Sequence, residues 1–446
     1  MIIRNGTVWL ENGPRQCDIR VADGKIAEVG NGLTNGGEDV VDVSGLDVLP
    51  GLVDMHVHVS DTAGRFCVAD TFHTGSYAAV QSGITTFVTF VTQNAGEMLD
   101  DAVARMARLA DGKSYCDYAF HVTPTQFGPG TFSAIEALAA RGFKTLKLYT
   151  TYKEAGLYVD YDLIREVMVR ASSLKTTVLV HCEDQETLDA VSPGPEETGS
   201  AAAHCRLRPP QAEAVAIQKI IELAAETRCR THIVHVSTEK GLVLIDKSRP
   251  SGGLTCETAP QYLLYNDSIL SGDGGHRFLC TPPFRGEHDR AGLEAASLVG
   301  VFDVFATDHC PFTRADKDSW NGDVRTVPSG VAGVGALFPL THEIVVKKHG
   351  RSLGEVVRLL AAGPARVAGL YPAKGTIRPG SDADLVIVDQ NGPPRPIISS
   401  IADCYETWPD RTTTLDFKFV FLRGEMVIKD NKFARPDAAT GRLAQG

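Results

Sequence analysis

Side chains that can bind a metal ion stand at the ends of several apolar runs in this 446-residue sequence. His56 and His58 end the run LVDMHVHV, and their i, i+2 spacing places both on one face of an extended strand. Four more candidates follow in later runs: Lys147 in TLKLYT, His181 after TTVLV, His235 in THIVHV, and Asp308 at the end of VFDVFATD. Neutral histidine nitrogen and carboxylate oxygen suit zinc or manganese, so these residues predict a transition-metal site if their strands converge.

The apolar runs alternate with helical patterns in a way that would bring their ends together. The predicted strands span residues 52–59, 84–91, 117–123, 145–150, 176–181, 231–236, 253–258 and 301–308. Predicted helices between them include residues 132–142, 161–174 and 210–227. Eight strands with crossovers fit a closed (β/α)8 barrel, an α/β fold, better than an open sheet, and no GxGxxG motif follows the first strand. In such a barrel the carboxyl ends of the strands meet on the face that carries active sites.

Each candidate also has an ordinary structural interpretation. A lone buried histidine such as His181 or His235 is more often a hydrogen-bonded core residue than a ligand. A lone lysine such as Lys147 usually extends to solvent, and Asp308 in Thr-Asp-His-Cys-Pro also resembles a helix cap. The occurrence of all these residues at strand ends, together with the His56-x-His58 pair, favours the metal site.

The other histidines do not share this placement. His232 lies three residues before His235, so we expect it to face away from the barrel axis. Six others fall on predicted helices or loops and are interpreted as structural: His73, His204, His276, His288, His342 and His349. His121 and His309 lie near strand ends, but neither is needed to complete the ligand set.

Lys147 has a charge that conflicts with a metal site. An ammonium group has no lone pair and would repel two divalent ions. If its amine adds carbon dioxide, the resulting carbamate (N6-carboxylysine) is an anion with two oxygens that can bridge both ions. We therefore take a carboxylated, bridging Lys147 as a hypothesis.

Both ends of the chain are rich in short β-type runs. Asn5-Gly6 and Asp23-Gly24 are hairpin signals between such runs near the N-terminus. Residues 382–390 and 417–432 form similar short β-type runs near the C-terminus. Neither end has enough strands to form a sheet alone. We expect a discontinuous β-sandwich domain of residues 1–50 and 375–432, a barrel of residues 51–374, and a C-terminal tail of residues 433–446. Residues 271–276 and 311–333 are interpreted as surface loops.

Composition limits the classes of partner. Asp and Glu total 55 against 44 Lys and Arg, a net charge of −11, whereas nucleic acids and anionic membranes require clustered positive charge. No apolar run approaches the ~20 residues of a membrane span, and the first residues read as a strand and turn rather than a signal peptide. The ten cysteines form no CxxC pair and are interpreted as reduced thiols. We therefore expect a cytoplasmic enzyme with no nucleic-acid or membrane partner.

A resemblance to a known family runs over about residues 1–430 and is carried by eight segments between residues 50 and 389: PGLVDMHVHV, KLYTTYK, VLVHCEDQE, THIVHVST, CETAPQYLL, FLCTPPFR, FATDHCPF and KGTIRPGSDADLVIVD. Together they resemble the cyclic amidohydrolases, and most closely the hydantoinase and dihydropyrimidinase branch. The resemblance implies a barrel with a β-sandwich from both ends, and two zinc-like ions bridged by a carboxylated lysine. By position it implies an inner ion held by His56, His58 and Asp308, an outer ion held by His181 and His235, and Lys147 bridging both.

The resemblance also implies substrate contacts and a catalytic base. Tyr152 lies five residues after Lys147, where this branch has a tyrosine that donates to the substrate carbonyl; the alternative is an aromatic ring packed under a loop. Thr281 and Ser329 stand where the branch usually has serine and asparagine, whose backbone binds the amide groups of the ring. Asp308 is expected to take a proton from the attacking hydroxide and return it to the ring nitrogen as the bond breaks.

Other positions bear on which ring is opened. Dihydroorotases carry an arginine two residues after His-x-His, where this chain has Ser60, although Arg65 could substitute from the next loop. Phe66 and Cys67 either form an apolar wall that selects the ring substituent or anchor a buried loop. Gly335 replaces an expected acidic residue. These differences leave the identity of the substrate ring undecided.

We expect hydrolysis of a hydantoin or dihydropyrimidine, a small cyclic ureide, to an N-carbamoyl amino acid by a homo-oligomer, a dimer or tetramer. An allantoinase or a dihydroorotase-like enzyme is the alternative within the family. A non-catalytic scaffolding homologue, from another class, is disfavoured because all six ligands are present.

Overall fold

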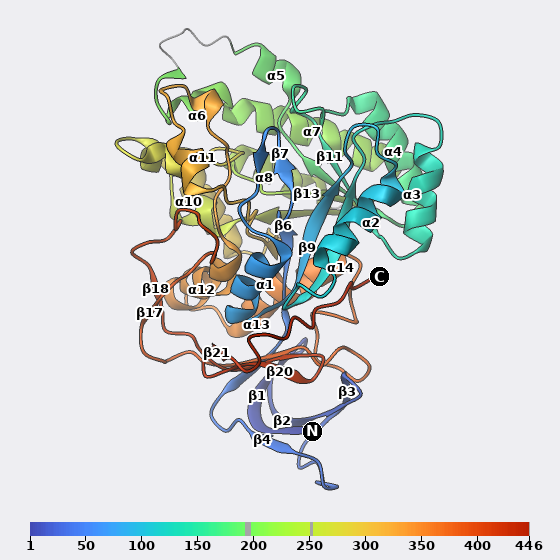
Figure 1. Ribbon diagram of the computed structural model, residues 1–446, viewed down its shortest axis with the longest axis vertical. Coiled ribbons are helices and arrows are strands. Elements are labelled where there is room, and N and C mark those ends of the chain that lie inside the picture. The colour runs from blue at the N-terminus through green and yellow to red at the C-terminus, as the bar shows by residue number, and fades with distance from the viewer. Residues whose placement is uncertain (192–197, 250–252, 446) are drawn as a thin grey trace.

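The computed structural model describes residues 1–191, 198–249 and 253–445. A large α/β body carries helices on its outside, and a smaller sheet lies below it in Figure 1. The loops after β6 and β12, marked by β7 and α5, lie at the end of the body opposite to that sheet (Figure 1). The N-terminus lies in the sheet, so the chain begins in the smaller part and then enters the larger one.

Eight parallel strands form the sheet of the larger body in the described part of the chain. In order of pairing they are β6 (Leu52–Val57), β9 (Ile84–Thr92), β10 (Asp117–Thr123), β11 (Thr145–Tyr149), β12 (Thr177–His181), β13 (Thr231–Ile233), β14 (Leu254–Thr258) and β15 (Val304–Phe305). The first strand returns beside the chain that follows the last, because Val57 bridges His309 and the His58 N–H donates to the His309 carbonyl at 2.7 Å. The predicted (β/α)8 barrel is confirmed.

Helices connect the strands and cover the outside of the barrel (Figure 1). The longer ones are α1 (Phe72–Gln81), α2 (Leu99–Ala110), α3 (Thr131–Ala140), α4 (Tyr161–Leu174), α7 (Pro210–Thr227), α8 (Glu239–Ser248) and α10 (Glu287–Ser297). Short α-helices are α5 (Gln185–Asp189), α6 (Ala203–Leu207), α9 (Pro260–Leu264), α11 (Arg314–Asp318), α12 (Leu337–Thr341), α13 (Leu353–Val357) and α14 (Gly363–Val367). Two π-helices, η7 (His342–Lys348) and η8 (Arg358–Ala362), and four 3₁₀ turns, η3 (Asp267–Leu270), η4 (Gly275–Phe278), η5 (Val324–Thr326) and η6 (Val334–Ala336), are described with them.

The predicted bounds of α4 and α7 agree with the structure, and local chemistry explains why. Asp160 caps α4 by accepting a hydrogen bond from the Leu163 N–H, and the helix buries Ile164, Val167, Met168 and Ala171 on one stripe. Pro210 opens α7 at a position where a missing N–H costs nothing. A side-chain cap in α4, a proline in the first turn of α7 and apolar periodicity in both therefore made these two helices predictable.

Strands from both ends of the chain pair in one nine-stranded sheet, confirming the expected separate module. They are β1 (Ile2–Leu10), β2 (Gly13–Ala22), β3 (Lys25–Gly30), β4 (Val40–Asp42), β5 (Asp47–Pro50), β16 (Leu385–Asp389), β19 (Asp416–Leu422), β20 (Glu425–Lys429) and β21 (Lys432–Phe433). The two ends meet where β5 pairs antiparallel with β16, with Val48 opposite Ile387. Two small hairpins stand apart from this sheet: β7 (Thr62–Ala63) with β8 (Phe66–Cys67), and β17 (Arg395–Pro396) with β18 (Thr412–Thr413).

A buried ion cluster joins the sheet to the barrel. The Lys374 ammonium lies 2.7 Å from Asp384 and 2.9 Å from Asp382, and it also contacts Asp117, which begins β10 of the barrel. These carboxylates raise the pKa of Lys374 although its burial acts in the opposite direction. At the crossing from β5 to β6, a Cβ on Gly51 would lie 2.6 Å from Asp384 Cβ, so only glycine lets the two modules approach this closely.

Three local expectations are wrong. Asn5-Gly6 does not form a hairpin turn but lies inside β1, at a register shift where Asn5 has φ 67°. An Asn-Gly pair tolerates positive φ in a bulge as well as in a turn, whereas Asp23-Gly24 does connect β2 to β3. The segments 271–276 and 311–333 are not simple surface loops, because they include part of η4, all of α11 and η5, and the buried Lys317.

Two predicted strands are shorter than expected. The last barrel strand spans two residues rather than 301–308, because carboxylates take the backbone N–H groups that a sheet would use: Asp303 accepts from Cys256, and Asp54 accepts from Thr307. The strand predicted at 231–236 ends at Ile233. Among the described residues no helix is long and apolar enough to cross a membrane, and all ten cysteines are free.

Candidate metal centre and active site

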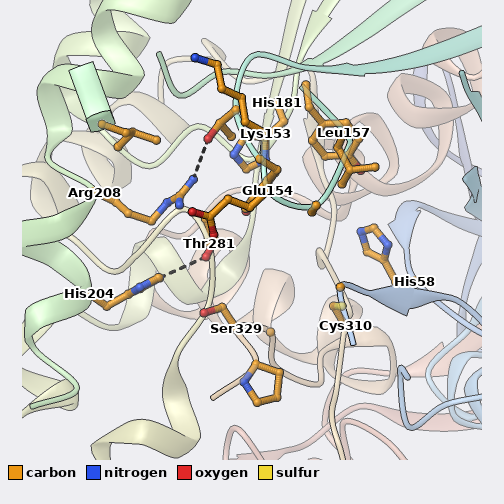
Figure 2. Close-up of a pocket in the computed structure, with 18 of the residues that line it drawn as sticks. His58, Lys153, Glu154, Leu157, His181, His204, Arg208, Thr281, Cys310 and Ser329 are labelled. Atoms are coloured by element: carbon orange, nitrogen blue, oxygen red, sulfur yellow. Dashed lines mark hydrogen bonds between the residues drawn. The ribbon is translucent and has the colours of Figure 1, made fainter. Parts of the chain in front are cut away.

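A cavity of 810 Å³ opens at the carboxyl ends of the barrel strands. Residues expected at the site from the sequence all line it: His56, His58, Lys147, Tyr152, His181, His235, Thr281, Asp308 and Ser329. Figure 2 shows His58, His181, Thr281 and Ser329 around this space. The barrel therefore brings together side chains that are up to 273 positions apart in the sequence, between His56 and Ser329.

His56 lies between two carboxylates. Its Nδ1 contacts Glu257, and its Nε2 lies 3.1 Å from Asp308 Oδ1. His58 Nε2 lies 3.7 Å from the same Asp308 oxygen. Burial disfavours an imidazolium, yet Glu257 and Asp308 outweigh it and raise the pKa of His56 to about 9. Two buried carboxylates around one imidazole form a pocket that favours a cation.

His181 and His235 form a second pair, with ring centroids 4.5 Å apart. His181 Nε2 lies 2.8 Å from Glu183 Oε2, which leaves Nδ1 of that ring available. His235 is 3 % exposed, and its Nδ1 has no hydrogen-bond partner in the described part of the chain. An unpartnered nitrogen at such depth is costly unless something binds it, and a metal ion is a natural acceptor of its lone pair.

Lys147 lies below these histidines, 1 % exposed. Its Nζ is 5.1 Å from the centre of the Phe90 ring and 4.9 Å from that of Tyr149. The Phe90 ring in turn stacks on His58 at 4.5 Å and meets His56 edge-on at 4.7 Å. Burial lowers the pKa of Lys147 to about 8, against the opposing pull of Glu257 and Asp308. The environment therefore makes the uncharged amine of Lys147 far more accessible than that of an ordinary lysine.

The donor set fits a metal centre. Donor atoms of His56, His235 and Asp308 lie within 4.8 Å of one another, so residues assigned to the inner and to the outer ion meet at one centre. Carboxylates hydrogen-bond the far nitrogens of His56 and His181, an arrangement that orients imidazole ligands in metal sites. A second acidic group, Asp117 with Asp382 and Asp384, has its centre filled by the Lys374 ammonium and is not a comparable site.

Three residues of the site have left-handed backbone. Tyr152 has φ 69°, His235 has φ 37° and Asp308 has φ 51°. Residues other than glycine adopt this region at a cost, and such strain concentrates at functional sites because the surrounding structure must hold it. At His235 this conformation also turns the chain out of the strand direction, so the alternation of faces stops there.

That turn explains the wrong expectation for His232. His232 does not face away from the barrel axis: its Nε2 lies 3.2 Å from Glu257 Oε2, on the carboxylate that also contacts His56. Its Nδ1 pairs with Thr255 Oγ1 at 2.8 Å. Both His232 and His235 therefore reach the interior, the first as a support for Glu257.

The two remaining ambiguous histidines have structural partners. His121 lies 2.7 Å from Thr145 Oγ1 and 2.8 Å from the Met55 carbonyl, and burial lowers its pKa to about 3. His309 accepts at Nδ1 from the Gly333 and Val334 N–H groups, and its Nε2 lies 3.0 Å from Asp70. Because His309 follows Asp308 directly, these bonds also hold the backbone of Asp308.

Hydrogen bonds join the two segments that carry Thr281 and Ser329, the expected substrate contacts. Lys317, 2 % exposed, donates to the Leu279 carbonyl at 3.1 Å and to the Pro328 carbonyl at 2.9 Å. The Gly330 N–H also donates to Leu279 at 2.7 Å. These bonds set the spacing between Thr281 and Ser329 across the cavity.

The cavity lining decides between the alternatives left open for the loop after β6. Phe66 and Cys67 do not line the cavity; Phe66 packs against Phe312 with ring centroids 6.1 Å apart, as a loop anchor would. Arg65 donates to the Thr326 carbonyl and is exposed, so it does not replace the arginine absent at Ser60. The cavity meets this loop through Gly64 and Val68 instead.

Gly335 is required by packing. A Cβ there would lie 2.1 Å from the Ile398 carbonyl oxygen, so an acidic side chain would not fit without moving that segment.

Five residues around the site were not predicted from the sequence: Glu183, His204, Arg208, Glu257 and Lys317. Glu183 and Glu257 carried a detectable signal, because each stands at or just beyond the end of a predicted strand. Arg208 and Glu183 form a buried ion pair with nitrogen–oxygen distances down to 2.6 Å. His204 was interpreted as structural but lines the cavity.

The sequence profile of the amidohydrolase family matches residues 48–427. The chain belongs to the amidohydrolase family. This amidohydrolase is 32 % identical over 444 residues to a D-hydantoinase of Ralstonia pickettii, and the match covers 97 % of this chain and 96 % of that protein. It is 31 % identical over 400 residues to an allantoinase of Escherichia coli, covering 88 % of this chain and 86 % of that protein.

The amidohydrolase also superposes on solved structures of the same branch. A crystal structure of dihydropyrimidinase from Brevibacillus agri NCHU1002 matches with a TM-score of 0.93 at 29 % identity, covering 99 % of this chain and 98 % of that one. A crystal structure of D-hydantoinase matches with a TM-score of 0.92 at 28 % identity, covering 100 % and 98 %. The expected resemblance to the hydantoinase and dihydropyrimidinase branch, and the expectation of a hydrolase, are confirmed.

Proposed function

We propose that this amidohydrolase opens a hydantoin or dihydropyrimidine ring by hydrolysis of a cyclic amide, giving an N-carbamoyl amino acid. The observation that carries the proposal is the meeting, in one cavity, of four histidines, Lys147, Asp308 and the Tyr152 hydroxyl. Full-length similarity to D-hydantoinases supports the ring class, and similarity to allantoinases makes allantoin the second candidate substrate.

Six residues would hold two divalent ions, zinc or manganese. His56, His58 and Asp308 are assigned to the inner ion, His181 and His235 to the outer one, and a carboxylated Lys147 to both. When bound, the ions supply an activated water at neutral pH and polarise the scissile carbonyl.

The side chains then perform the remaining steps. Tyr152 donates its hydroxyl hydrogen to the carbonyl oxygen, on which negative charge develops as the carbon becomes tetrahedral. Asp308 takes the proton of the attacking hydroxide and delivers it to the ring nitrogen as the C–N bond breaks. The other proton of the water has already passed to solvent when the hydroxide formed, so the product carries a carboxylate and a neutral ureido group. The backbone at Thr281 and Ser329 binds the amide groups of the ring.

A substrate panel tests the proposal. Enzyme loaded with zinc or manganese in bicarbonate buffer is assayed with hydantoin, dihydrouracil, allantoin and dihydroorotate. We expect hydantoin or dihydrouracil to give the largest kcat/KM and dihydroorotate the smallest, since no arginine stands at position 60. The strongest turnover on allantoin would favour the alternative, and no turnover on any ring would overturn the proposal. We also propose that the enzyme is a homo-oligomer, and light scattering measures the number of chains in it.

A further inference from the structure

Three charged residues outside the ligand set link the two histidines assigned to the outer ion. Arg208 follows α6 directly, Glu213 lies in the first turn of α7, and Arg285 lies between α9 and α10. Glu213 is 2 % and Arg285 4 % exposed, and Arg208 lines the cavity (Figure 2). We call these three residues the clamp, and none of them has a role in the proposed function so far.

Arg208 holds His181 through Glu183. The guanidinium donates to both oxygens of the Glu183 carboxylate, from Nε at 3.1 Å and 3.0 Å and from Nη2 at 2.6 Å. Glu183 is buried, and its Oε2 lies 2.8 Å from His181 Nε2. A carboxylate paired with a guanidinium only accepts, so His181 Nε2 carries the hydrogen and Nδ1 keeps the lone pair that a metal ion needs. The contact therefore sets both the direction and the tautomer of the His181 ring.

Glu213 holds the turn that follows His235. Its carboxylate accepts from the Ser237 N–H at 3.1 Å and from the Thr238 N–H at 2.9 Å, and it also accepts from both of their hydroxyl groups. These two residues come directly after Val236, which follows His235, and His235 has the strained φ of 37°. Glu213 therefore fixes the chain just beyond the strained residue, which keeps the His235 ring directed into the cavity.

Arg285 joins the two halves of the clamp. Its Nη1 donates to the Arg208 carbonyl, and its Nε donates to the Ser237 hydroxyl at 3.0 Å. Its Nη2 lies 3.6 Å from Glu213 Oε2. Because the same guanidinium contacts the supports of both histidines, the clamp sets the spacing of the two rings, whose centroids lie 4.5 Å apart.

The ligands assigned to the inner ion have other supports. Glu257 contacts His56, and the backbone of Asp308 is held through the residue that follows it. In the described part of the chain, no hydrogen bond or ion pair joins the clamp to His56, His58 or Asp308. A defect in the clamp should therefore affect the outer ion and spare the inner one.

We propose that Arg208, Glu213 and Arg285 are positioning residues that set the affinity of the outer metal ion by holding His181 and His235. This inference rests on the proposed function, which assigns the two histidines to the outer ion. It extends that function to residues that bind no ion themselves. Loss of a partner behind a metal ligand typically weakens metal binding by ~10–100-fold, which gives the size of the expected effect.

Zinc binding tests the inference without turnover. Zinc-free protein in bicarbonate buffer is titrated with zinc against a chelating dye, and the outer ion is identified as the one missing from His181→Ala. Arg208→Met keeps an unbranched stem against the Tyr152 ring, and Glu213→Gln keeps the size of the side chain. We expect each to raise the Kd of the outer ion by ~10–100-fold and that of the inner ion by less than about threefold.

Two further variants show whether Arg208 acts through Glu183. Arg208→Lys keeps the charge but not the forked contact, so its outer Kd should lie between those of wild type and Arg208→Met. Glu183→Gln should also weaken the outer ion, and adding Arg208→Met to it should cause no further loss. Losses that multiply in the double variant would overturn the inference, because Arg208 would then act on the ion by another route.

Exposed residues provide matched controls. Arg165 pairs with Glu226 at the surface, and Glu222 accepts from Gln218 on the exposed side of α7. Arg165→Met and Glu222→Gln should therefore leave the affinity of both ions unchanged. The inner ion, measured in the same titration, reports a general folding defect in any variant.

The outcomes separate this inference from the proposed function. Equal weakening of both ions, or an unchanged outer ion in Arg208→Met and Glu213→Gln, would overturn the inference while wild type still binds two ions. Wild type that binds fewer than two ions would refute the proposed metal centre itself. Selective loss of the outer ion from a protein that opens no ring would support the clamp and refute only the proposed ring opening.

Discussion

Lys147 must lose its proton before its amine can add carbon dioxide. In the addition, the nitrogen lone pair forms a bond to the carbon of carbon dioxide and the nitrogen releases a proton, which leaves an anionic carbamate. The burial that lowers the pKa of Lys147 to about 8 therefore prepares the site for this reaction before any metal is bound. The test removes carbon dioxide from the metal-free wild-type protein and compares its activation with that of the variant Lys147→Met.

The size of the effect follows from the pKa. At pH 7.5, an amine of pKa about 8 is about 24 % uncharged, whereas one at the ordinary 10.5 is about 0.1 % uncharged. The reactive fraction is thus ~240-fold larger than for an ordinary lysine. The uncharged fraction approaches saturation above pH 8. At a constant concentration of dissolved carbon dioxide, the rate of activation should therefore rise about tenfold per pH unit at low pH and level off near pH 8.

The assay follows metal loading rather than pH-dependent turnover. Protein is stripped of metal and degassed, and zinc is then added with or without bicarbonate at pH values from 6.5 to 9.5. The bicarbonate concentration is adjusted at each pH so that dissolved carbon dioxide stays constant. Activity is measured in a common buffer after quenching, and bound zinc is counted in parallel. We expect activation to require bicarbonate in wild type and to fail in Lys147→Met.

Lys144→Met is the matched control. Lys144 precedes Lys147 by three residues, and its ammonium donates to the Ala139 carbonyl on a partly exposed face, so the substitution should leave activation unchanged. Activation of wild type to the same extent without carbon dioxide, or a pH dependence that still rises tenfold per unit above pH 9, would refute the reasoning.

Three more outcomes are expected. Asp308→Asn should lower kcat by ~10²–10⁴-fold while circular dichroism stays near that of wild type, and near-normal turnover would discard Asp308 as the proton carrier. Lys374→Met should lower the free energy of unfolding by about 3–5 kcal/mol, because Asp384 remains buried without its cation and Asp117, among the described residues, keeps only the Arg423 cation; an unchanged denaturation midpoint would contradict this. Burial lowers the pKa of Lys317 to about 8 from 10.5, so between these values the unfolded chain binds a proton that the folded chain has lost, and stability rises with pH. From pH 7 to 9.5, urea titrations should show wild type gaining about 2 kcal/mol relative to Lys317→Met, and a loss over that range would refute the assignment.

The residues that can bind metal were predictable from the sequence because a barrel places all residues at the carboxyl ends of its strands on one face. His56, Lys147, His181 and Asp308 each lie at or near the carboxyl end of an apolar run, and parallel strands bring those ends together whatever the loops between them do. Local signals predicted α4 and α7, where a capping Asp160 or an initial Pro210 agrees with the apolar spacing.

The residues that support the metal ligands could not be predicted, because their roles depend on contacts between segments that are distant in the sequence. Glu257 matters because it meets His56, 201 positions away. His232 and His235 both reach the interior because the left-handed backbone at His235 breaks the alternation of faces. His204 and Lys317 act through carbonyl groups of distant loops, which carry no side-chain signal in a sequence. Strand length was also unpredictable where side-chain carboxylates, such as Asp303, replace sheet hydrogen bonds.

The number of metal ions bound per chain tests the central claim most directly. Protein reconstituted with zinc in bicarbonate buffer and freed of excess metal is analysed by elemental mass spectrometry beside a variant that lacks both His181 and His235. We predict about two ions per wild-type chain and at most about one in the variant, because the inner ligands His56, His58 and Asp308 would remain. Wild type that binds none, or a variant that still binds two, would contradict the account.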